Sequence, residues 1–198
     1  MYKFVKRLLD ILISLIALPF FGIIFLILAP AIYFTDKGPV FYNAPRLGRN
    51  GKIFNMYKFR SMRVNAPDLR NADGSTYNGE NDPRVTKIGK IMRKTSLDEL
   101  PQLLNVLKGD MSIVGPRGFL TTKFRNLESL SEPERKRLTV RPGITGYSQA
   151  YFRNSISMDE KIKYDCYYVD HMSFWLDVKI IFQTALSVLK HENIYVKQ

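Results

Sequence analysis

Two adjacent carboxylates, Asp98 and Glu99, are the residues of this sequence whose types and setting best suit catalysis. They occur in the segment Arg93-Lys94-Thr95-Ser96-Leu97-Asp98-Glu99-Leu100-Pro101-Gln102. One interpretation is structural, because Ser96 and Glu99 have the spacing of a capping box and acids in a first helical turn are stabilised by the helix dipole. Pro101 counts against it, since it would then remove a hydrogen bond beyond the first turn.

The other interpretation of this pair is chemical. If Pro101 is the first helical residue, both carboxylates lie in the approach to a helix whose free N–H groups favour phosphate. An ionised Asp98 beside a bound phosphate could act as a nucleophile. Other cations could line the same pocket, and Gly143 lets the backbone approach a ligand closely. These cations are Lys58, Arg60, Arg93, Arg117 and Arg141, the last two in turns that contain glycine and proline.

The composition indicates an anionic partner. The 198 residues form about one domain, carry a formal net charge of +12 and are 45% hydrophobic, which excludes general disorder. The single cysteine, Cys166, excludes a disulfide framework, and His171 and His191 lie too far apart in sequence to predict a zinc site. A metal, if used, would be a hard ion held by carboxylates and phosphates, and Mg²⁺ is the expected one.

The N-terminal part of the chain predicts a membrane element at residues 1–36. No charged residue occurs from Ile11 to Phe34, and about 20 apolar residues suffice to span a bilayer. The run is too long for the core of a signal peptide. A straight span is disfavoured, because Pro19 lies in the middle of the run and basic residues lie on both sides of it, which marks both sides as cytoplasmic. We therefore expect a re-entrant helix that breaks at Pro19, with the Ser14 hydroxyl helping to satisfy the freed carbonyls.

Residues 37–198 are expected to form a cytoplasmic catalytic domain. The strands and helices expected in it predict an α+β fold that is mostly helical. Strands at Val40–Tyr42 and Ile53–Phe59 form a hairpin around Asn50-Gly51, with Lys58 and Arg60 on one face. A loop follows from Asn65 to Asn81. Amphipathic helices are then expected at Asp82 to Lys94, at Leu100 to Leu107, after the capping boxes Ser131/Glu134 and Ser157/Glu160, and at Ser173 to Lys190. The last of these suits the membrane surface or the underside of the domain.

Several short motifs of the sequence together resemble those of the small bacterial phosphoglycosyl transferases, which are monotopic membrane enzymes. The resemblance covers nearly the whole chain, and the motifs occur in the family's order. They are Tyr57-Lys58-Phe59-Arg60-Ser61-Met62, Asn81-Asp82-Pro83-Arg84-Val85-Thr86, Thr95 to Leu103, Asn105 to Ser112, Val114-Gly115-Pro116-Arg117 and Arg141-Pro142-Gly143-Ile144-Thr145-Gly146. Two positions depart from the family's pattern: Leu18 replaces a common serine before the membrane proline, and Gly118 replaces a common proline.

The resemblance implies transfer of a sugar-1-phosphate from a UDP-sugar to polyprenyl phosphate, with release of UMP. Asp98 would be the nucleophile that forms a covalent phosphosugar intermediate, Glu99 its partner, and Mg²⁺ would contact Asp98. The cations above, with Gly143 and Thr145, would bind substrate. The resemblance places the enzyme at the bacterial inner membrane with its catalytic domain on the cytoplasmic face, where downstream glycosyltransferases would use its product.

Two alternatives remain at the level of sequence. The first is direct, single-step transfer in which the carboxylates only hold metal. The second is a membrane-tethered protein that binds nucleic acid or acidic lipid, because Tyr57 and Phe59 alternate with Lys58 and Arg60 and could stack on bases. No helix-turn-helix or RNA-binding motif accompanies them, so we expect no nucleic-acid partner.

Overall fold

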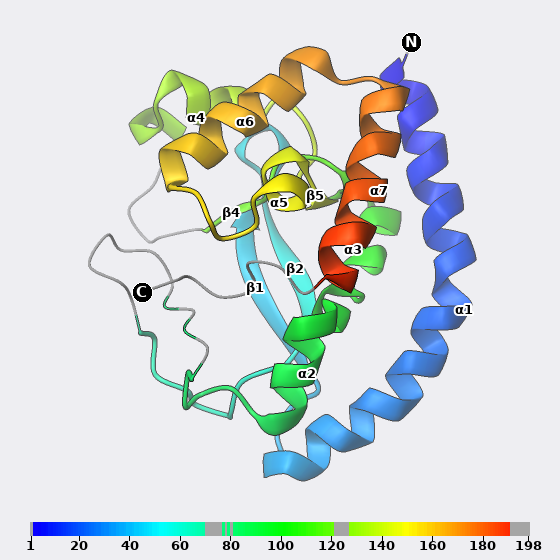
Figure 1. Ribbon diagram of the computed structural model, residues 1–198, viewed down its shortest axis with the longest axis vertical. Coiled ribbons are helices and arrows are strands. Elements are labelled where there is room, and N and C mark those ends of the chain that lie inside the picture. Colours follow the sequence, from blue (N-terminus) through cyan, green and yellow to red (C-terminus); the bar gives the residue numbers. More distant parts are fainter. Residues whose placement is uncertain (1, 70–76, 78, 80, 121–126, 191–198) are drawn as a thin grey trace.

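The N-terminal helix α1 runs along one side of the molecule, and the other elements lie against its concave side (Figure 1). The computed structural model describes residues 2–69, 77, 79, 81–120 and 127–190. Helix α1 extends from Tyr2 to Asp36 and is long and apolar enough to cross a membrane. Its outward side chains are mostly large and hydrophobic, including Phe4, Leu12, Ile16, Phe20, Leu26 and Phe34.

The predicted break of α1 at Pro19 is wrong, because the helix continues through both Pro19 and Pro30. Proline removes one N–H donor, but a long helix tolerates that loss as a bend while the bonds on either side persist. Ser14 does not take the helper role expected of it: its hydroxyl is buried and has no hydrogen-bond partner among the described residues. Helix α1 ends at Asp36, where the predicted membrane element ends, and its re-entrant path stays a prediction.

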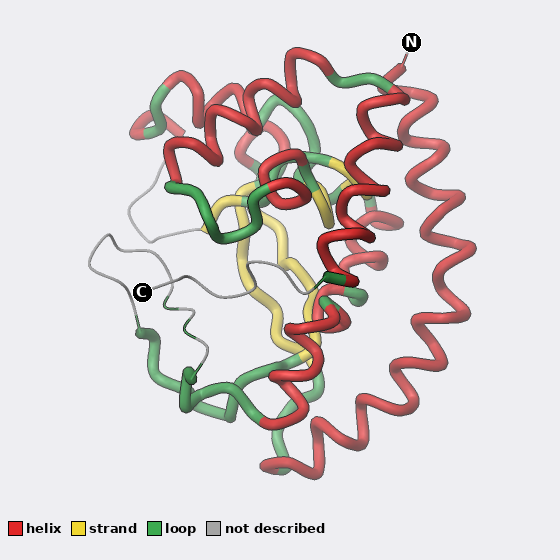
Figure 2. The backbone as a smooth tube through the Cα atoms, viewed as in Figure 1, coloured by secondary structure: helices red, strands yellow, loops and turns green. Residues whose placement is uncertain are grey.

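The expected hairpin is confirmed, and its strands β1 and β2 are two of the three strands of a small sheet in which β1 is central (Figure 2). Strand β1 (Phe41–Leu47) pairs antiparallel with β2 (Ile53–Phe59) across the 3-10 turn η1 (Arg49–Gly51). Asn50 and Gly51 have φ of 56° and 74°, the left-handed values that this pair of residues tolerates. The sequence did not predict β4 (Phe119–Leu120), which pairs with β1, or the parallel pair of β3 (Ser112–Val114) and β5 (Gly143–Thr145).

Helices surround these strands, which confirms an α+β, mostly helical fold. They are α2 (Lys87–Thr95), α3 (Gln102–Lys108), α4 (Glu132–Arg137), α5 (Tyr147–Tyr151), α6 (Met158–His171) and α7 (Phe174–Leu189), with 3-10 turns η2 (Leu97–Glu99) and η3 (Leu127–Ser129). Both predicted capping boxes are present at the starts of α4 and α6. Helix α7 buries Ile180 and packs against α5, while Trp175 and Phe182 stay exposed.

Helix α2 starts later than the sequence predicts. Its first residue is Lys87, and the hydroxyl of Thr86 caps it by accepting a hydrogen bond from the Gly89 N–H at 2.9 Å. Asp82 cannot cap a helix because its carboxylate is taken by Arg84, whose Nε and Nη2 donate to it at 2.9 Å and 2.7 Å. Arg84 also donates to the carbonyls of Pro67 and Tyr77, and so it ties together the ends of the predicted loop. Residues 70–76, 78 and 80 of that loop lie outside the described residues.

Two hydrophobic clusters fix α1 and the hairpin to the segment that carries the carboxylate pair. Leu28 and Ile32 of α1 pack with Phe59 of β2 and Met92 of α2. The other cluster joins the hairpin to α3 and to the residue before β3, through Ala44, Phe54, Met56, Val106 and Met111. The dyad of Asp98 and Glu99 lies on η2, between α2 and α3, so both clusters flank it.

Polar contacts fix the first turns of α1 to α3 and to β3. Near its start, Arg7 donates to the carbonyls of Val106 and Leu107 at the C-terminal end of α3, at 2.7 Å and 3.1 Å. Asp10 is buried and accepts hydrogen bonds from the Ser112 hydroxyl and the Ile113 amide. The bonds from Arg7 add side-chain donors to carbonyls at the end of α3, and together with those of Asp10 they couple α1 to the chain that follows the dyad.

The buried pair of Asp82 and Arg84 should make stability depend on pH in a defined direction. The Arg84 guanidinium lowers the pKa of Asp82, so the pair stabilises the fold above about pH 4 and this stabilisation is lost as the pH falls through the lowered pKa. Asp82→Asn should reduce the free energy of unfolding at pH 7 by roughly 3 kcal/mol, because it leaves Arg84 buried without its counter-charge. Chemical denaturation in detergent at pH 7 and below pH 4 measures both effects.

The matched control for this prediction is Asp159→Asn, which removes an exposed carboxylate from the first turn of α6. It should change the free energy of unfolding by less than about 0.5 kcal/mol. If Asp82→Asn were as stable as this control at pH 7, the pair would not hold the segment between β2 and α2.

Candidate active site

The two carboxylates lie on the short turn η2, immediately before α3. Ser96 ends α2 in a left-handed conformation (φ 57°), and its side chain does not cap the following turn, so the capping-box interpretation is wrong. Pro101 directly precedes Gln102, the first residue of α3, and both carboxylates therefore lie in the approach to that helix. The amides of Leu103 and Leu104 donate to the carbonyls of Leu100 and Pro101, so these two N–H groups are not free, and phosphate binding at the helix start stays a prediction.

Glu99 is held by two cations on the same oxygen. Lys58 Nζ lies 2.5 Å and Arg117 Nη2 lies 3.1 Å from its Oε1. Asp98 has a looser environment: its Oδ2 lies 4.0 Å from Lys58 Nζ, and its carboxylate accepts no hydrogen bond from the described residues. The two neighbours thus differ, since Glu99 is fixed by hydrogen-bonded ion pairs while Asp98 is available to a ligand.

The electrostatic environment separates the two carboxyl groups further. Burial raises the pKa of Asp98 above its ordinary value, and Glu99 adds to this rise, although Lys58 opposes it. Burial also acts to raise the pKa of Glu99, but the charges of Lys58 and Arg117 outweigh it and lower that pKa to about 2. A pair of carboxyls with diverging pKa values is typical of a site in which the two groups have different roles. Glu99 remains an anion, and Asp98 is the more basic of the two.

Lys58 reaches the dyad because β2 is locked to α3. The buried side chain of Asn105 in α3 accepts a hydrogen bond from the Tyr57 amide at 2.9 Å and donates to the Asn55 carbonyl at 2.8 Å. A side-chain amide that bonds both an N–H and a C=O of a strand fixes the strand's register against the helix. No local sequence pattern indicates this role of Asn105, because it depends on a contact between segments that are distant in sequence.

Two further cations lie around the dyad. Arg93 lowers the pKa of Asp98 by its charge, and its Nε donates to the Ser61 hydroxyl at 3.0 Å. Arg153 was not predicted. It follows α5, has a positive φ of 50°, and its Nη2 donates to the Ser96 hydroxyl at 3.2 Å, two residues before Asp98. Charge interactions of Arg153 with both Glu99 and Asp98 place it in the same electrostatic site.

Arg60 was predicted to bind substrate, but the structure places it elsewhere. It is buried, forms an ion pair with Asp36 at 2.7 Å, and donates to the carbonyls of Ile32 and Pro39. Strand β2 ends at Phe59, so the alternation that set Arg60 beside Lys58 no longer holds at residue 60. Arg60 therefore anchors the end of α1.

The side chains of Arg141 and Thr145 have partners other than the dyad. Arg141 donates from Nε to the Gly109 carbonyl at 2.9 Å, and its charged neighbours are Arg49, Arg7 and Asp10. A Cβ on Gly143 would lie 2.1 Å from the Gly115 amide nitrogen, so glycine is needed here for the contact between two backbones rather than for a ligand. Thr145 shares a hydrogen bond with Thr184 of α7 at 2.7 Å. These contacts assign structural partners to all three residues.

The donor set at the dyad fits a magnesium ion only in combination with substrate oxygens. The described residues contain no group of three or more His, Cys, Asp or Glu side chains that could hold a metal. Mg²⁺ is commonly held by one or two carboxylates together with substrate phosphates, and Asp98 supplies a carboxylate without hydrogen bonds to the described chain. Glu99 already neutralises Lys58 and Arg117, so Asp98 is the residue that fits such an ion.

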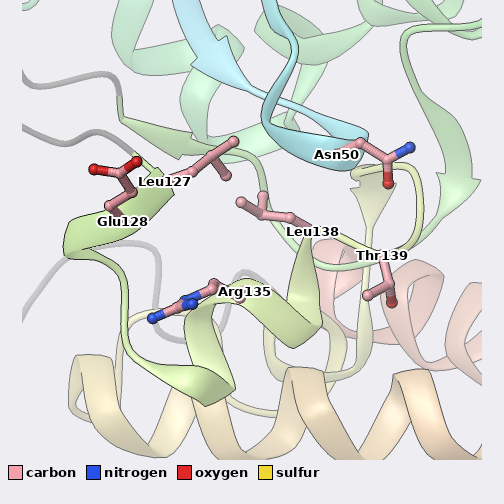
Figure 3. A pocket seen from close by; sticks show the side chains of 6 residues that line it. All are labelled: Asn50, Leu127, Glu128, Arg135, Leu138 and Thr139. Carbon is pink, nitrogen blue, oxygen red and sulfur yellow. The ribbon is translucent and has the colours of Figure 1, made fainter.

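A groove on the surface lies away from the dyad (Figure 3). It has a volume of about 300 Å³ and lies between the hairpin turn η1 and helix α4. Its lining side chains are Asn50, Leu127, Glu128, Arg135, Leu138 and Thr139. None of the dyad residues or their cations lines it, so the groove is separate from the candidate active site.

Comparison with known proteins shows the family of the chain. The family model described as bacterial sugar transferase matches residues 1–191. A galactosyl transferase, CpsE, of Streptococcus agalactiae is 45% identical over 93% of this chain and 42% of its own length. An undecaprenyl-phosphate galactose phosphotransferase of Salmonella typhimurium is 38% identical over 98% of this chain and 42% of its own length.

The chain therefore spans less than half the length of these two relatives. It spans 89% of a sugar transferase of Bacillus subtilis, EpsL, which is 42% identical over 96% of this chain. Because the family model matches almost the whole of the described structure, including the dyad and every cation around it, the chain belongs to the bacterial sugar transferase family.

Proposed function

We propose that this protein transfers a sugar-1-phosphate from a UDP-sugar to polyprenyl phosphate, through a covalent intermediate on Asp98. The observation that carries the proposal is the asymmetry of the dyad: Glu99 is neutralised by Lys58 and Arg117, whereas Asp98 makes no hydrogen bond to the described residues. The family supports the reaction class, since relatives are named as undecaprenyl-phosphate phosphotransferases of galactose and of N-acetylgalactosamine.

In the first step, a carboxylate oxygen of Asp98 attacks the sugar-bearing phosphorus of the donor. The bond between that phosphorus and the bridging oxygen breaks, and UMP leaves with the oxygen and its electron pair. In the second step, an oxygen of polyprenyl phosphate attacks the same phosphorus, the bond to Asp98 breaks, and the carboxylate is regenerated. Splitting one transfer into two displacements at a side chain is the general logic of covalent catalysis.

The surrounding cations stabilise the negative charge that these steps bring together. Lys58, Arg93, Arg117 and Arg153 interact with the dyad from β2, α2, the segment between β3 and β4, and the segment after α5. Cations preorganised around a transferring phosphoryl group lower the barrier because they need no rearrangement during the reaction. Asp98, with the donor's phosphates, would hold Mg²⁺, which supplies further neutralisation of phosphate charge when bound.

The long apolar helix α1 supports a membrane location for this reaction. Polyprenyl phosphate stays in the bilayer, so its enzyme must bring the reactive group to the membrane boundary. Arg60 and Asp36 at one end of α1, and Arg7 and Asp10 near the other, connect the helix to the segments on either side of the dyad. Basic residues on both flanks of the apolar run favour the cytoplasmic face. The sugar-lipid product would then serve downstream glycosyltransferases.

Asp98→Asn should abolish transfer while the fold is retained. Asparagine has nearly the same volume but lacks the anionic oxygen, so we expect product formation to fall by at least about 10³-fold. The measurement is UMP release and lipid-linked product from a panel of UDP-sugars with polyprenyl phosphate in liposomes. Asp159→Asn serves as the control with unchanged turnover, and substantial transfer by Asp98→Asn would remove Asp98 from the mechanism.

Arg153→Gln should weaken the reaction through the loss of one cation at the dyad. Hydrogen bonds to charged groups contribute about 1.5–3 kcal/mol, so kcat/KM for the donor should fall by roughly 10–100-fold. The charge-matched control is Arg135→Gln, since Arg135 lies on α4 and bonds the Leu130 carbonyl in the separate groove. Equal donor kinetics for the two variants would show that Arg153 does not act on the substrate.

A further inference from the structure

A buried ion pair joins α4 to α6 behind the active site. Arg137 Nη2 lies 2.6 Å from Asp165 Oδ2, and the two side chains are 4% and 1% exposed. The Ser148 hydroxyl of α5 donates to the other oxygen of Asp165 at 2.7 Å. Such pairs are weak evidence for stability, because the cost of removing two charges from water offsets most of their attraction. The contacts of this pair indicate a different role.

The pair holds the backbone of Arg117. The same Nη2 of Arg137 donates to the Arg117 carbonyl at 3.0 Å. Asp165 lies 2.6 Å from the same guanidinium nitrogen, so the buried charge pair fixes the position from which Arg137 donates to this carbonyl.

Arg117 needs such support because of where it lies. It occupies the irregular segment between β3 and β4, and its own side chain is 47% exposed. A long exposed side chain loses rotamer freedom when it is held in one position. Arg117 nevertheless donates to Glu99 at 3.1 Å, so its backbone must be fixed for the guanidinium to meet that oxygen. The neighbouring Pro116 carbonyl is likewise engaged, by the Gly143 amide at 3.0 Å.

We propose that Arg137 and Asp165 are positioning residues, which hold the backbone of Arg117 so that its guanidinium stays on Glu99 during phosphosugar transfer. This inference rests on the proposed function. It assigns to a buried pair on two helices outside the dyad a specific effect on the reaction, exerted through one arginine. Neither residue contacts the dyad in the described structure, so neither is a catalytic residue.

A double-mutant cycle tests the inference, because a residue that acts only through Arg117 has no effect once the Arg117 side chain is gone. The variants are Arg137→Met, Arg117→Gln and the double variant, each assayed for kcat and KM by UMP release, with thermal unfolding measured in parallel. We expect Arg137→Met alone to lower kcat by 10–100-fold. In the Arg117→Gln background, the same change should lower kcat by less than about 3-fold.

A merely structural role gives a different result. Arg137→Met would then lower activity by the same factor in both backgrounds, in step with its loss of thermal stability, and the inference would be overturned. Lys136→Gln is the matched control, because Lys136 also joins α4 to α6, through a surface pair with Asp170 at 2.7 Å. It should leave kcat unchanged in both backgrounds.

A second variant covers the case in which Arg137→Met does not fold. The pair replacement Arg137→Met with Asp165→Leu removes both charges together, which buried pairs often tolerate without loss of stability. A folded pair variant with wild-type kcat would overturn the inference, and one with kcat lowered as by Arg117→Gln would support it. An unmodified protein that releases no UMP from any UDP-sugar would instead contradict the proposed function itself, and the inference with it.

Discussion

The ion pairs that hold Glu99 between Lys58 and Arg117 are the interaction on which the rest of the site depends. They neutralise one member of the dyad completely and leave the other, Asp98, with a nearby positive charge at 4.0 Å and no hydrogen bond from the described residues. Two adjacent carboxylates without such partners would repel each other, and one of them would take up a proton. The cations therefore give the two carboxylates different environments, and the proposed mechanism assigns the nucleophilic role to Asp98 for this reason.

The elements around the dyad position Lys58 and Arg117 so that both contact the same oxygen of Glu99. Lys58 lies on β2, whose register against α3 is set by Asn105. Arg117 lies on an irregular segment, and its backbone carbonyl accepts a hydrogen bond from Arg137. Helix α1 is tied to the same frame through Arg7 and Arg60. In the proposed function, an apolar helix fixed at both ends to the segments around the dyad would bring a lipid phosphate and a soluble nucleotide-sugar to the same site.

The elements that depend on a local sequence pattern could be predicted, whereas residue positions that depend on contacts between distant segments could not. The Asn50-Gly51 hairpin and the capping boxes are local, and both are present. Arg60 was misassigned because strand alternation does not predict where a strand ends. The backbone contact of Gly143 with Gly115, the residue that follows β3, was not predicted, because the parallel pairing of β3 with β5 has no local sequence signal. Arg153 was missed for the same reason, since packing of α5 on α7 carries it to the dyad.

The most direct test of this account is to incubate the protein with a UDP-sugar in the absence of polyprenyl phosphate and to measure its mass after an acid quench. The account predicts a mass increase of one phosphosugar, located by digestion to the peptide that contains Asp98 and removed when polyprenyl phosphate is added before the quench. An enzyme that turns over normally yet shows no adduct under these conditions, or carries it on another residue, would contradict the role assigned to Asp98.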